Sequence, residues 1–257
     1  MKSLLRRWSR PPGAPAASRF IDGARMYCIG DIHGRADLLL DLQAQIEADA
    51  RSYTGHLMML YLGDYIDRGS QSRQVVEMLL ERPLEGFETI HLKGNHEQAL
   101  LDFLRYPEDT AAWLDFGGLE TLDSYGLSLG FQPRKQDLGE LARQLEAVLP
   151  DAHRAFFESG LLHWRGGDYL FVHAGIRPGV ALDAQHEEDL MWIREEFTGS
   201  HRDHGAVVVH GHTISPEPEF RFNRIGLDTG AFHTGVLSCL VLEGADQRLL
   251  QTSPGPG

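Results

Sequence analysis

Residues 30–34 read Gly-Asp-Ile-His-Gly and place the carboxylate of Asp31 two positions before the imidazole of His33. This stretch directly follows the apolar run at 26–29 and precedes a segment whose leucines have helical spacing. A strand that ends in a glycine-flanked Asp-x-His presents two metal-binding side chains from one rigid edge. A single pair of this kind has low specificity, so its meaning depends on the residues at the ends of the other predicted strands.

Comparable polar clusters follow four further apolar runs. Residues 63–69 read Gly-Asp-Tyr-Ile-Asp-Arg-Gly, residues 94–97 read Gly-Asn-His-Glu, and two later clusters place histidine beside alanine or glycine. Five predicted strand ends thus carry the candidate metal ligands Asp31, His33, Asp64, Asn95, His173 and His212. Individually, such residues often serve as turn or structural residues, and Arg68 alone would suit a surface ion pair. Their joint placement favours a metal site.

Strands and helices alternate along the first hundred residues. Apolar runs predict strands at 25–29, 56–62 and 87–92, and helical spacing predicts helices at 35–52, 70–81 and 97–104. This order favours a layered α/β fold, in which ligands gather at the carboxyl edge of the sheet. Further strands are predicted at 168–172, 206–209, 224–227, 236–242 and 248–251, with a short helix at 188–196.

Residues 106–160 have a different pattern, in which glycine and proline interrupt short helical segments and no strand pattern is present. We interpret this segment as a helical insertion that covers the site, with Trp113, Phe116 and Tyr125 as its small core. The domain prediction is a disordered basic arm at 1–20, one domain at 21–251 and a flexible tail at 252–257.

The net charge of −13 is unevenly distributed. The first 20 residues contain five basic residues and no acidic one, so the remaining chain carries −18. This acidic bulk argues against a broad nucleic-acid surface and suits a site that concentrates divalent cations. No apolar run reaches the roughly 18 residues that a membrane span needs. The two cysteines, Cys28 and Cys239, suit buried apolar positions and a reducing compartment, so we expect a cytoplasmic protein.

The mixture of carboxylate, imidazole and carboxamide ligands suits Mn, Fe or Zn ions better than Mg or Ca. Six ligands suffice for two ions about 3.5–4 Å apart if one carboxylate bridges them, and Asp64 is the natural bridge. Two such ions favour the hydrolysis of phosphate esters. The leaving alkoxide needs a proton, which His96 can supply if Asp67 orients its ring. Arg68 can bind phosphate oxygens as a bidentate donor.

The series of motifs resembles that of the calcineurin-like metallophosphoesterases, and more narrowly the phosphoprotein phosphatase branch in its compact bacterial and phage form. The resemblance covers about residues 25–250. It implies a four-layer α-β-β-α sandwich with a dimetal centre at its upper edge. By this resemblance, the first ion is held by Asp31, His33 and Asp64. The second is held by Asp64, Asn95, His173 and His212.

The same resemblance implies roles for other polar residues. His96, paired with Asp67, is the expected general acid. The expected phosphate-binding residues are Arg68, Arg194 and Asn95. His210 is expected to be structural or to support a ligand, and His233 lies near a loop that borders the site in relatives. Four other histidines, His56, His91, His153 and His163, are interpreted as structural.

The resemblance implies a serine/threonine protein phosphatase that uses two divalent ions, with Mn²⁺ expected, and acts on a phosphorylated protein or peptide. The alternative is a symmetrical dinucleoside tetraphosphate hydrolase. Those hydrolases typically lack the Asp-Arg pair and carry aspartate in place of the third motif's glutamate, so Asp67, Arg68 and Glu97 favour the phosphatase. A nuclease and a non-enzymatic, metal-bound scaffold are weaker alternatives. No nucleic-acid or membrane partner is expected.

Overall fold

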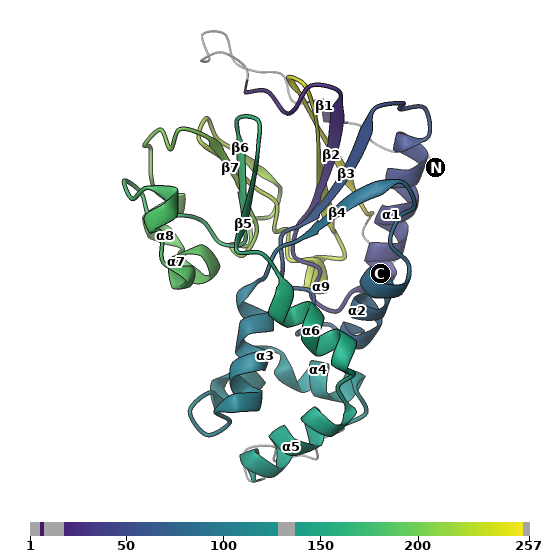
Figure 1. The fold of residues 1–257 in the computed structure, drawn as a ribbon, viewed down its shortest axis with the longest axis vertical. Helices are drawn as coiled ribbons and strands as arrows, with labels where there is room; N and C mark the ends of the chain where they lie inside the picture. Colours follow the sequence, from purple (N-terminus) through teal and green to yellow (C-terminus); the bar gives the residue numbers. More distant parts are fainter. Residues whose placement is uncertain (1–5, 8–17, 128–136, 254–257) are drawn as a thin grey trace.

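The computed structural model describes residues 6–7, 18–127 and 137–253 of the 257-residue chain. Two β-sheets stand face to face, and helices lie on the outer face of each sheet (Figure 1). The predicted four-layer α-β-β-α sandwich is therefore confirmed. This arrangement follows from the alternation of strands and helices, because each parallel strand pair needs a crossover that returns along a sheet face.

The first sheet has the strand order β1-β11-β10-β2-β3-β4. Its parallel part consists of β2 (Ala24–Ile29), β3 (His56–Tyr61) and β4 (Phe87–His91). Two helices, α1 (Ala36–Ala50) and α2 (Ser72–Glu81), connect these strands and cover the outer face. The hairpin of β10 (Ser238–Glu243) and β11 (Asp246–Gln251) joins this sheet because β10 pairs antiparallel with β2.

The second sheet has the order β5-β6-β7-β9-β8. Its inner strands β6 (Tyr169–Val172), β7 (Val207–His210) and β9 (Arg224–Gly226) run parallel. The edge strands β5 (His163–Gly166) and β8 (Glu219–Phe220) pair antiparallel with their neighbours, and the sequence pattern predicted neither. Between β6 and β7 lie η3 (Leu182–Ala184), α7 (Glu187–Trp192) and α8 (Glu195–Thr198), so the helix predicted at 188–196 is divided. Helix α9 (Ala231–Thr234) follows β9.

Strand alternation produces separate hydrophobic clusters between the layers. In β2, Tyr27 and Ile29 belong to the cluster shared with α1 and α2, whereas Met26 and Cys28 belong to the cluster between the two sheets. A third cluster joins β6 and β7 to the helices α7 and α8, where Phe197 is buried. Because successive side chains of a strand point to opposite faces, a strand apolar on both faces must be covered on both sides.

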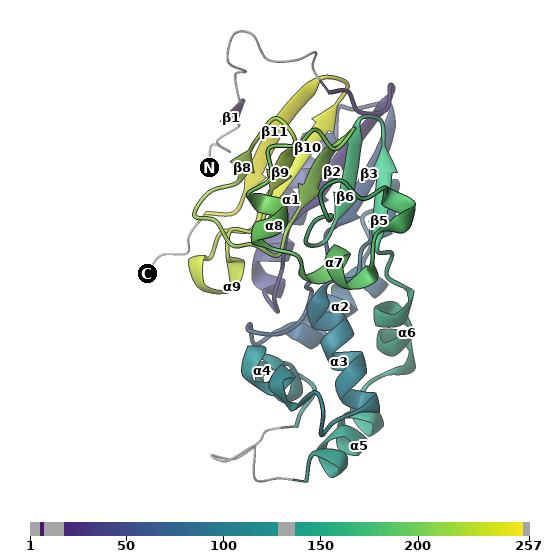
Figure 2. The same cartoon turned by 90° about the vertical axis from the view of Figure 1, so that its left-hand side faces the viewer.

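The helical segment after β4 lies beyond the strand ends rather than against a sheet face (Figure 2). It contains α3 (Asn95–Arg105), η1 (Ala111–Phe116), α4 (Gly118–Ser124), α5 (Leu138–Val148) and α6 (Asp151–Ser159). Trp113 and Tyr125 are buried within it, as predicted. Phe116 is 55% exposed, so the prediction that it belongs to the core of this segment is wrong.

Most of the predicted basic arm, and residues 254–257 of the predicted tail, lie outside the described residues. Within the arm, β1 (Arg6–Arg7) pairs antiparallel with β11, and Phe20 is buried against Trp164 and Tyr169. The packed part of the chain therefore begins before residue 21. None of the helices in residues 18–127 and 137–253 combines the length and apolar content that crossing a bilayer requires.

Candidate metal centre

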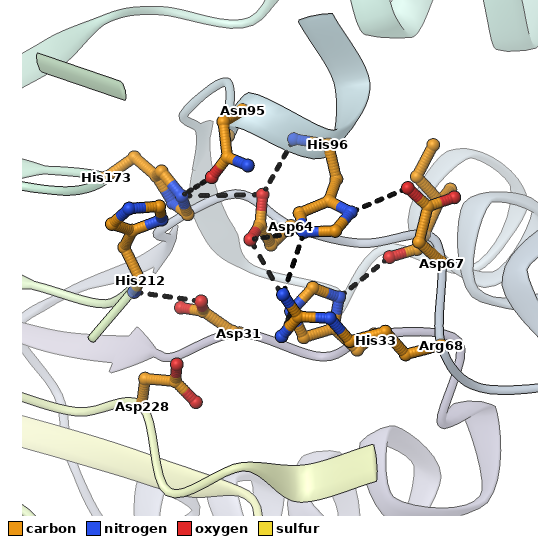
Figure 3. A network of polar contacts seen from close by, with 12 residues as sticks. Asp31, His33, Asp64, Asp67, Arg68, Asn95, His96, His173, His212 and Asp228 are labelled. Carbon is orange, nitrogen blue, oxygen red and sulfur yellow. Dashed lines mark hydrogen bonds and ion pairs between the residues drawn. The ribbon is translucent and has the colours of Figure 1, made fainter. Parts of the chain in front are cut away.

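The carboxyl ends of the parallel strands meet at one edge of the sandwich and bring the predicted site residues together (Figure 3). From the first sheet, Asp31 follows β2 and Asp64 follows β3. From the second, His173 follows β6 and His212 follows β7. Helix α3 begins at Asn95, two residues before the predicted start, so its first turn carries Asn95 and His96 into the site.

Asp64 lies at the centre of this cluster. Its Oδ1 is 3.4 Å from Nε2 of His173, and its Oδ2 is 3.5 Å from Nε2 of His33 and 3.8 Å from Nε2 of His96. Two groups of donor atoms, each within 4.8 Å of one another, share this carboxylate: His33, Asp64 and His96, and Asp64, His173 and His212. A carboxylate common to two donor groups is what a bridging ligand requires.

Two of these histidines each make a hydrogen bond through Nδ1, which fixes the tautomer of the ring. The Nδ1–H group of His33 donates to the Ile66 carbonyl oxygen at 2.9 Å, and that of His173 donates to the Leu62 carbonyl oxygen at 2.9 Å. Each Nε2 atom therefore turns a lone pair toward the cluster. Burial lowers the pKa of His33 to about 3 and that of His212 to about 2, and it also lowers the pKa of His173. These imidazoles are thus neutral, which is the metal-binding form.

Several buried oxygen and nitrogen atoms of the site carry lone pairs that find no hydrogen-bond donor in the segments that the structure describes, and a divalent cation would satisfy them. Within the described residues, Oδ1 of Asp31 and Nε2 of His212 have no hydrogen-bond partner. Nε2 of His173 and Oδ1 of Asn95 both carry lone pairs, yet they lie 2.9 Å apart. Burial and the neighbouring charge of Asp228 raise the pKa of Asp31, the opposite of what an adjacent cation would do. The donor set therefore fits a pair of divalent ions.

The backbone is strained at this site. In the described part of the chain, the non-glycine residues with positive φ are His33, Asp64, Asp67, Arg68 and His212. All five are predicted site residues, and such conformations cost of order 1–3 kcal/mol each. Gly94 and Gly211 allow the loops to close around the carboxylates, since a Cβ there would lie 2.1 Å from Oδ1 of Asp64 and 1.9 Å from Oδ1 of Asp31.

Glu97 holds the second motif in this conformation. Its buried carboxylate accepts hydrogen bonds from the backbone N–H groups of Asp64 at 2.9 Å, Tyr65 at 2.8 Å and Gly94 at 2.9 Å. Burial and the charge of Asp64 raise the pKa of Glu97 to about 7, although the backbone donors oppose this shift. In the sequence, Glu97 only distinguished the phosphatases from the dinucleoside tetraphosphate hydrolases. In the structure, its hydrogen bonds join the loop that contains Asp64 to the loop that contains Gly94.

His96 and Asp67 form a close pair next to Asp64. Nδ1 of His96 donates to Oδ2 of Asp67 at 2.6 Å, so Nε2 is directed into the site. Burial lowers the pKa of His96, but the charge of Asp64 and the bond to Asp67 outweigh it, so the net pKa is raised. A raised pKa favours the protonated imidazole, which is the form that a proton donor requires.

The helical segment holds Asp67 from the other side. Trp113 Nε1–H donates to Oδ2 of Asp67 at 2.8 Å, and the Thr121 hydroxyl donates to Oδ1 at 2.6 Å. All three side chains are buried. The sequence pattern assigned Trp113 to the core alone, but its indole nitrogen also supports the histidine pair. No local signal could have shown this, because Trp113 and Asp67 are 46 residues apart.

Replacing Thr121 by Val removes the hydroxyl donor to Asp67. We expect the free energy of unfolding to fall by ~1–3 kcal/mol, because a buried carboxylate oxygen loses its partner. Turnover should fall as well, since Asp67 is then held less firmly. Denaturant unfolding and steady-state rates measure the two effects. Thr110→Val is the matched control, because that hydroxyl donates to the Tyr106 carbonyl oxygen of its own turn. Equal effects of the two changes would contradict the proposed support of Asp67.

The two predicted phosphate-binding arginines lie by different histidines. Arg68 donates to Nε2 of His33 at 3.0 Å, and its guanidinium nitrogen lies 3.2 Å from Nε2 of His96. Its guanidinium also lies 5.0 Å from the ring centre of Phe232. Arg194 donates to the carbonyl oxygen of His212 at 3.3 Å. The alternative of a surface ion pair for Arg68 does not hold, because its partners are two buried imidazoles.

The other histidines are placed away from the shared carboxylate. His210 packs its ring on Phe197 at 5.1 Å and lines a separate cavity of about 380 Å³. His233 is exposed and lies against Phe232. His91 stacks on Tyr61, and His153 bonds the Tyr125 hydroxyl. Sequence reasoning missed two neighbours of the site, Asp228 beside Asp31 and Phe232 over His33, although both follow the predicted strand at 224–227.

Comparisons with known proteins identify the family of this chain. The family described as calcineurin-like phosphoesterase matches residues 24–232. The asymmetrical bis(5'-nucleosyl)-tetraphosphatase PrpE of Anoxybacillus flavithermus is 23% identical over 82% of this chain and 88% of its own length. Serine/threonine-protein phosphatase 2 of Salmonella typhimurium is 28% identical over 83% and 90%. A cold-active protein tyrosine phosphatase shares the fold, with a TM-score of 0.59, 17% identity and coverage of 95% and 84%. The chain belongs to the calcineurin-like phosphoesterase family and is a hydrolase.

Proposed function

We propose that this hydrolase cleaves phosphate monoesters and acts as a serine/threonine protein phosphatase on phosphorylated proteins or peptides. The observation that carries the proposal is the 2.6 Å bond between His96 and Asp67, with Arg68 beside it. A phosphomonoester offers one phosphate and one leaving alkoxide. His96 can supply the proton for the alkoxide, and Arg68 is a cation that can bind the phosphate. The relative named serine/threonine-protein phosphatase 2 supports the choice of substrate.

The proposed ligands divide into two sets that share Asp64. Asp31, His33 and Asp64 would hold the first ion, and Asp64, Asn95, His173 and His212 the second. When bound, the ions supply Lewis-acid polarisation of the phosphate and an activated water. The mixed nitrogen and oxygen donors favour Mn²⁺, with Fe or Zn as alternatives. We also propose a cytoplasmic location, in keeping with the buried, unpaired Cys28 and Cys239.

The chain's own residues perform the remaining steps. Nε2 of His96 donates the proton to the leaving oxygen, and Asp67 holds the imidazole so that this nitrogen faces the substrate. Arg68, Arg194 and Asn95 bind the phosphate oxygens. Arg68 now donates to Nε2 of His33, so that guanidinium and a cation compete for one lone pair. Arg68 is therefore free to bind phosphate when His33 serves as a ligand.

Replacing Arg68 by Ala should raise the inhibition constant of inorganic phosphate by roughly 10–100-fold, because a charge-assisted bond contributes about 1.5–3 kcal/mol. Metal content should stay unchanged, since Arg68 is not a proposed ligand. Product inhibition and elemental analysis test the two statements. Arg73→Ala is the control, because that arginine pairs with Glu77 on helix α2. An unchanged inhibition constant for phosphate would remove Arg68 from the proposed phosphate site.

A dinucleoside tetraphosphate hydrolase is the second candidate, and one structural observation favours it. Trp192 is 42% exposed, and its ring centre lies 6.2 Å from that of His212, next to Arg194. An exposed indole beside a phosphate-binding arginine can stack on a nucleobase. The relatives named as asymmetrical bis(5'-nucleosyl)-tetraphosphatases point the same way.

A direct comparison of substrates decides between the two. The metal-stripped protein is reloaded with Mn²⁺, and kcat/KM is measured for a panel of phosphoserine and phosphothreonine peptides and for diadenosine tetraphosphate. The proposal expects the better peptides to exceed the dinucleotide. Faster turnover of the dinucleotide would reverse the ranking, and the nucleotide products would then distinguish symmetrical from asymmetrical cleavage.

A further inference from the structure

We infer that Asp228 is a further carboxylate of the metal centre, which supplies negative charge to the first ion's site beside Asp31. This role goes beyond the six ligands considered above. It rests on the dimetal centre of the proposed function, because the charge of Asp228 would act on an ion bound there.

Asp228 occupies a sixth strand end at the same edge of the sandwich. It follows Leu227 after β9, within the sequence Asp-Thr-Gly, and it is only 2% exposed. Local bonds fix its position: the N–H of Gly230 donates to its Oδ1 at 2.9 Å, and the N–H of Ser215 donates to its carbonyl oxygen at 3.0 Å. The side chain is therefore held by the backbone rather than by another side-chain cation.

The second oxygen of Asp228 has no such partner. Within the described residues, Oδ2 of Asp228 and Oδ1 of Asp31 are both buried without a hydrogen-bond partner. The two carboxyl groups are neighbours, as Figure 3 shows. Each already accepts one backbone N–H, from Gly230 and from His212. Two adjacent acceptor groups with free oxygens match the needs of a cation.

The position of Asp228 also accounts for an asymmetry in the proposed ligands. The second ion has four protein ligands, whereas the first has three, one of which is shared. Asp228 lies beside Asp31, a proposed first-ion ligand, and away from His173 and Asn95 (Figure 3). Its charge would therefore strengthen the site with fewer ligands. A competing explanation is a proton shared by Asp31 and Asp228, in which case Asp228 acts only as a structural donor.

The substitution Asp228→Asn separates the two explanations, because asparagine keeps the shape and a donor group but removes the charge. We expect the affinity for one of two Mn²⁺ ions to fall by about 10–100-fold, the usual effect of losing a group that supports metal ligands. Calorimetric titration of the metal-free protein measures this. The melting temperature of the metal-free variant should equal or exceed that of the wild type, because one of two adjacent buried carboxylates is gone.

Asp203→Asn is the matched control. Asp203 makes the same local contact, with the N–H of Gly205 donating to its Oδ1 at 2.8 Å, and Gly205 has the same left-handed backbone as Gly230. It is exposed in a surface loop, so its replacement should leave both Mn²⁺ affinities unchanged. The ion affected in D228N should be the one lost in Asp31→Asn and not the one lost in His212→Ala. The Mn²⁺ affinities of double variants, which combine D228N with each of the other two substitutions, identify this ion.

Two Mn²⁺ ions bound by D228N with wild-type affinity would overturn the inference and favour the shared proton. Asp228→Ala provides a second variant that also lacks the charge. If both variants fail to fold without metal, as judged by circular dichroism, Asp228 is structural and the inference is again wrong. If the wild-type protein itself binds fewer than two ions, the dimetal centre of the proposed function fails, and the role of Asp228 fails with it.

Discussion

The replacement of His96 by Asn is expected to reduce turnover by about 10²–10⁴-fold while the protein retains its metal ions. In the proposed mechanism, Nε2 of His96 protonates the leaving oxygen, and asparagine has no titratable proton near neutral pH. Asp67 should stay in place, because Trp113 and Thr121 still donate to its carboxylate. Steady-state kinetics and elemental analysis of the same preparation test both parts of this prediction.

The metal measurement matters because the geometry also permits a second role for His96. Its ring nitrogen belongs to a donor group with His33 and Asp64, where it could bind a metal ion itself. Loss of metal together with activity in His96→Asn would make it a ligand and exclude the proton-donor role. His153→Asn is the matched control, because His153 is also buried but bonds Tyr125 in the helical segment. That change should leave turnover near the wild-type value.

Replacement of Asp64 by Asn should have the largest effect on metal binding of any single substitution. Both donor groups share this carboxylate, so removing its charge weakens the two proposed sites together. Lewis-acid stabilisation contributes several kcal/mol to such reactions, and each ~1.36 kcal/mol is a factor of ten in rate. We therefore expect turnover to fall by about 10³-fold or more. Asparagine tolerates the left-handed backbone of this residue, at φ 53°, so the loop should keep its conformation.

Metal content per chain and thermal unfolding with and without Mn²⁺ test this prediction. A ligand that binds only the folded state raises its stability, so the wild type should melt higher with Mn²⁺ and Asp64→Asn should show little change. Asp102→Asn on helix α3 is the control, because that carboxylate bonds Gln98 outside the site. If Asp64→Asn lost one ion and kept the other at full affinity, Asp64 would be a ligand of one ion rather than a bridge.

Much of the fold was predictable because its signals are local. In β2, apolar residues on both faces indicated a strand covered on both sides, and the helical spacing in residues 35–52 indicated the crossover after it. Each polar motif stood directly after such a strand. Parallel strands end at a common edge, so the sequence alone indicated that Asp31, Asp64 and His173 lie near one another. The roles assigned to these residues stay predictions.

Short elements without a local signal were not predictable. The edge strand β5 reads His-Trp-Arg-Gly and lacks an apolar face, so only its pairing with β6 defines it. Helix α3 begins at Asn95 because Glu97 accepts the N–H of Gly94, a bond that a hydrophobic pattern does not register. As a result, His96 projects from a helical turn rather than from a strand end.

The sequence by itself determined the layered fold and the motifs that carry the proposed ligands, because both depend on patterns within a few residues. Only the tertiary structure decided which groups complete the site. Trp113 and Thr121 reach Asp67 across 46 and 54 residues, and Asp228 meets Asp31 only when β9 of one sheet comes to lie beside β2 of the other. Contacts between distant segments follow from the packing of whole layers, and the spacing of nearby residues in the sequence contains no information about that packing.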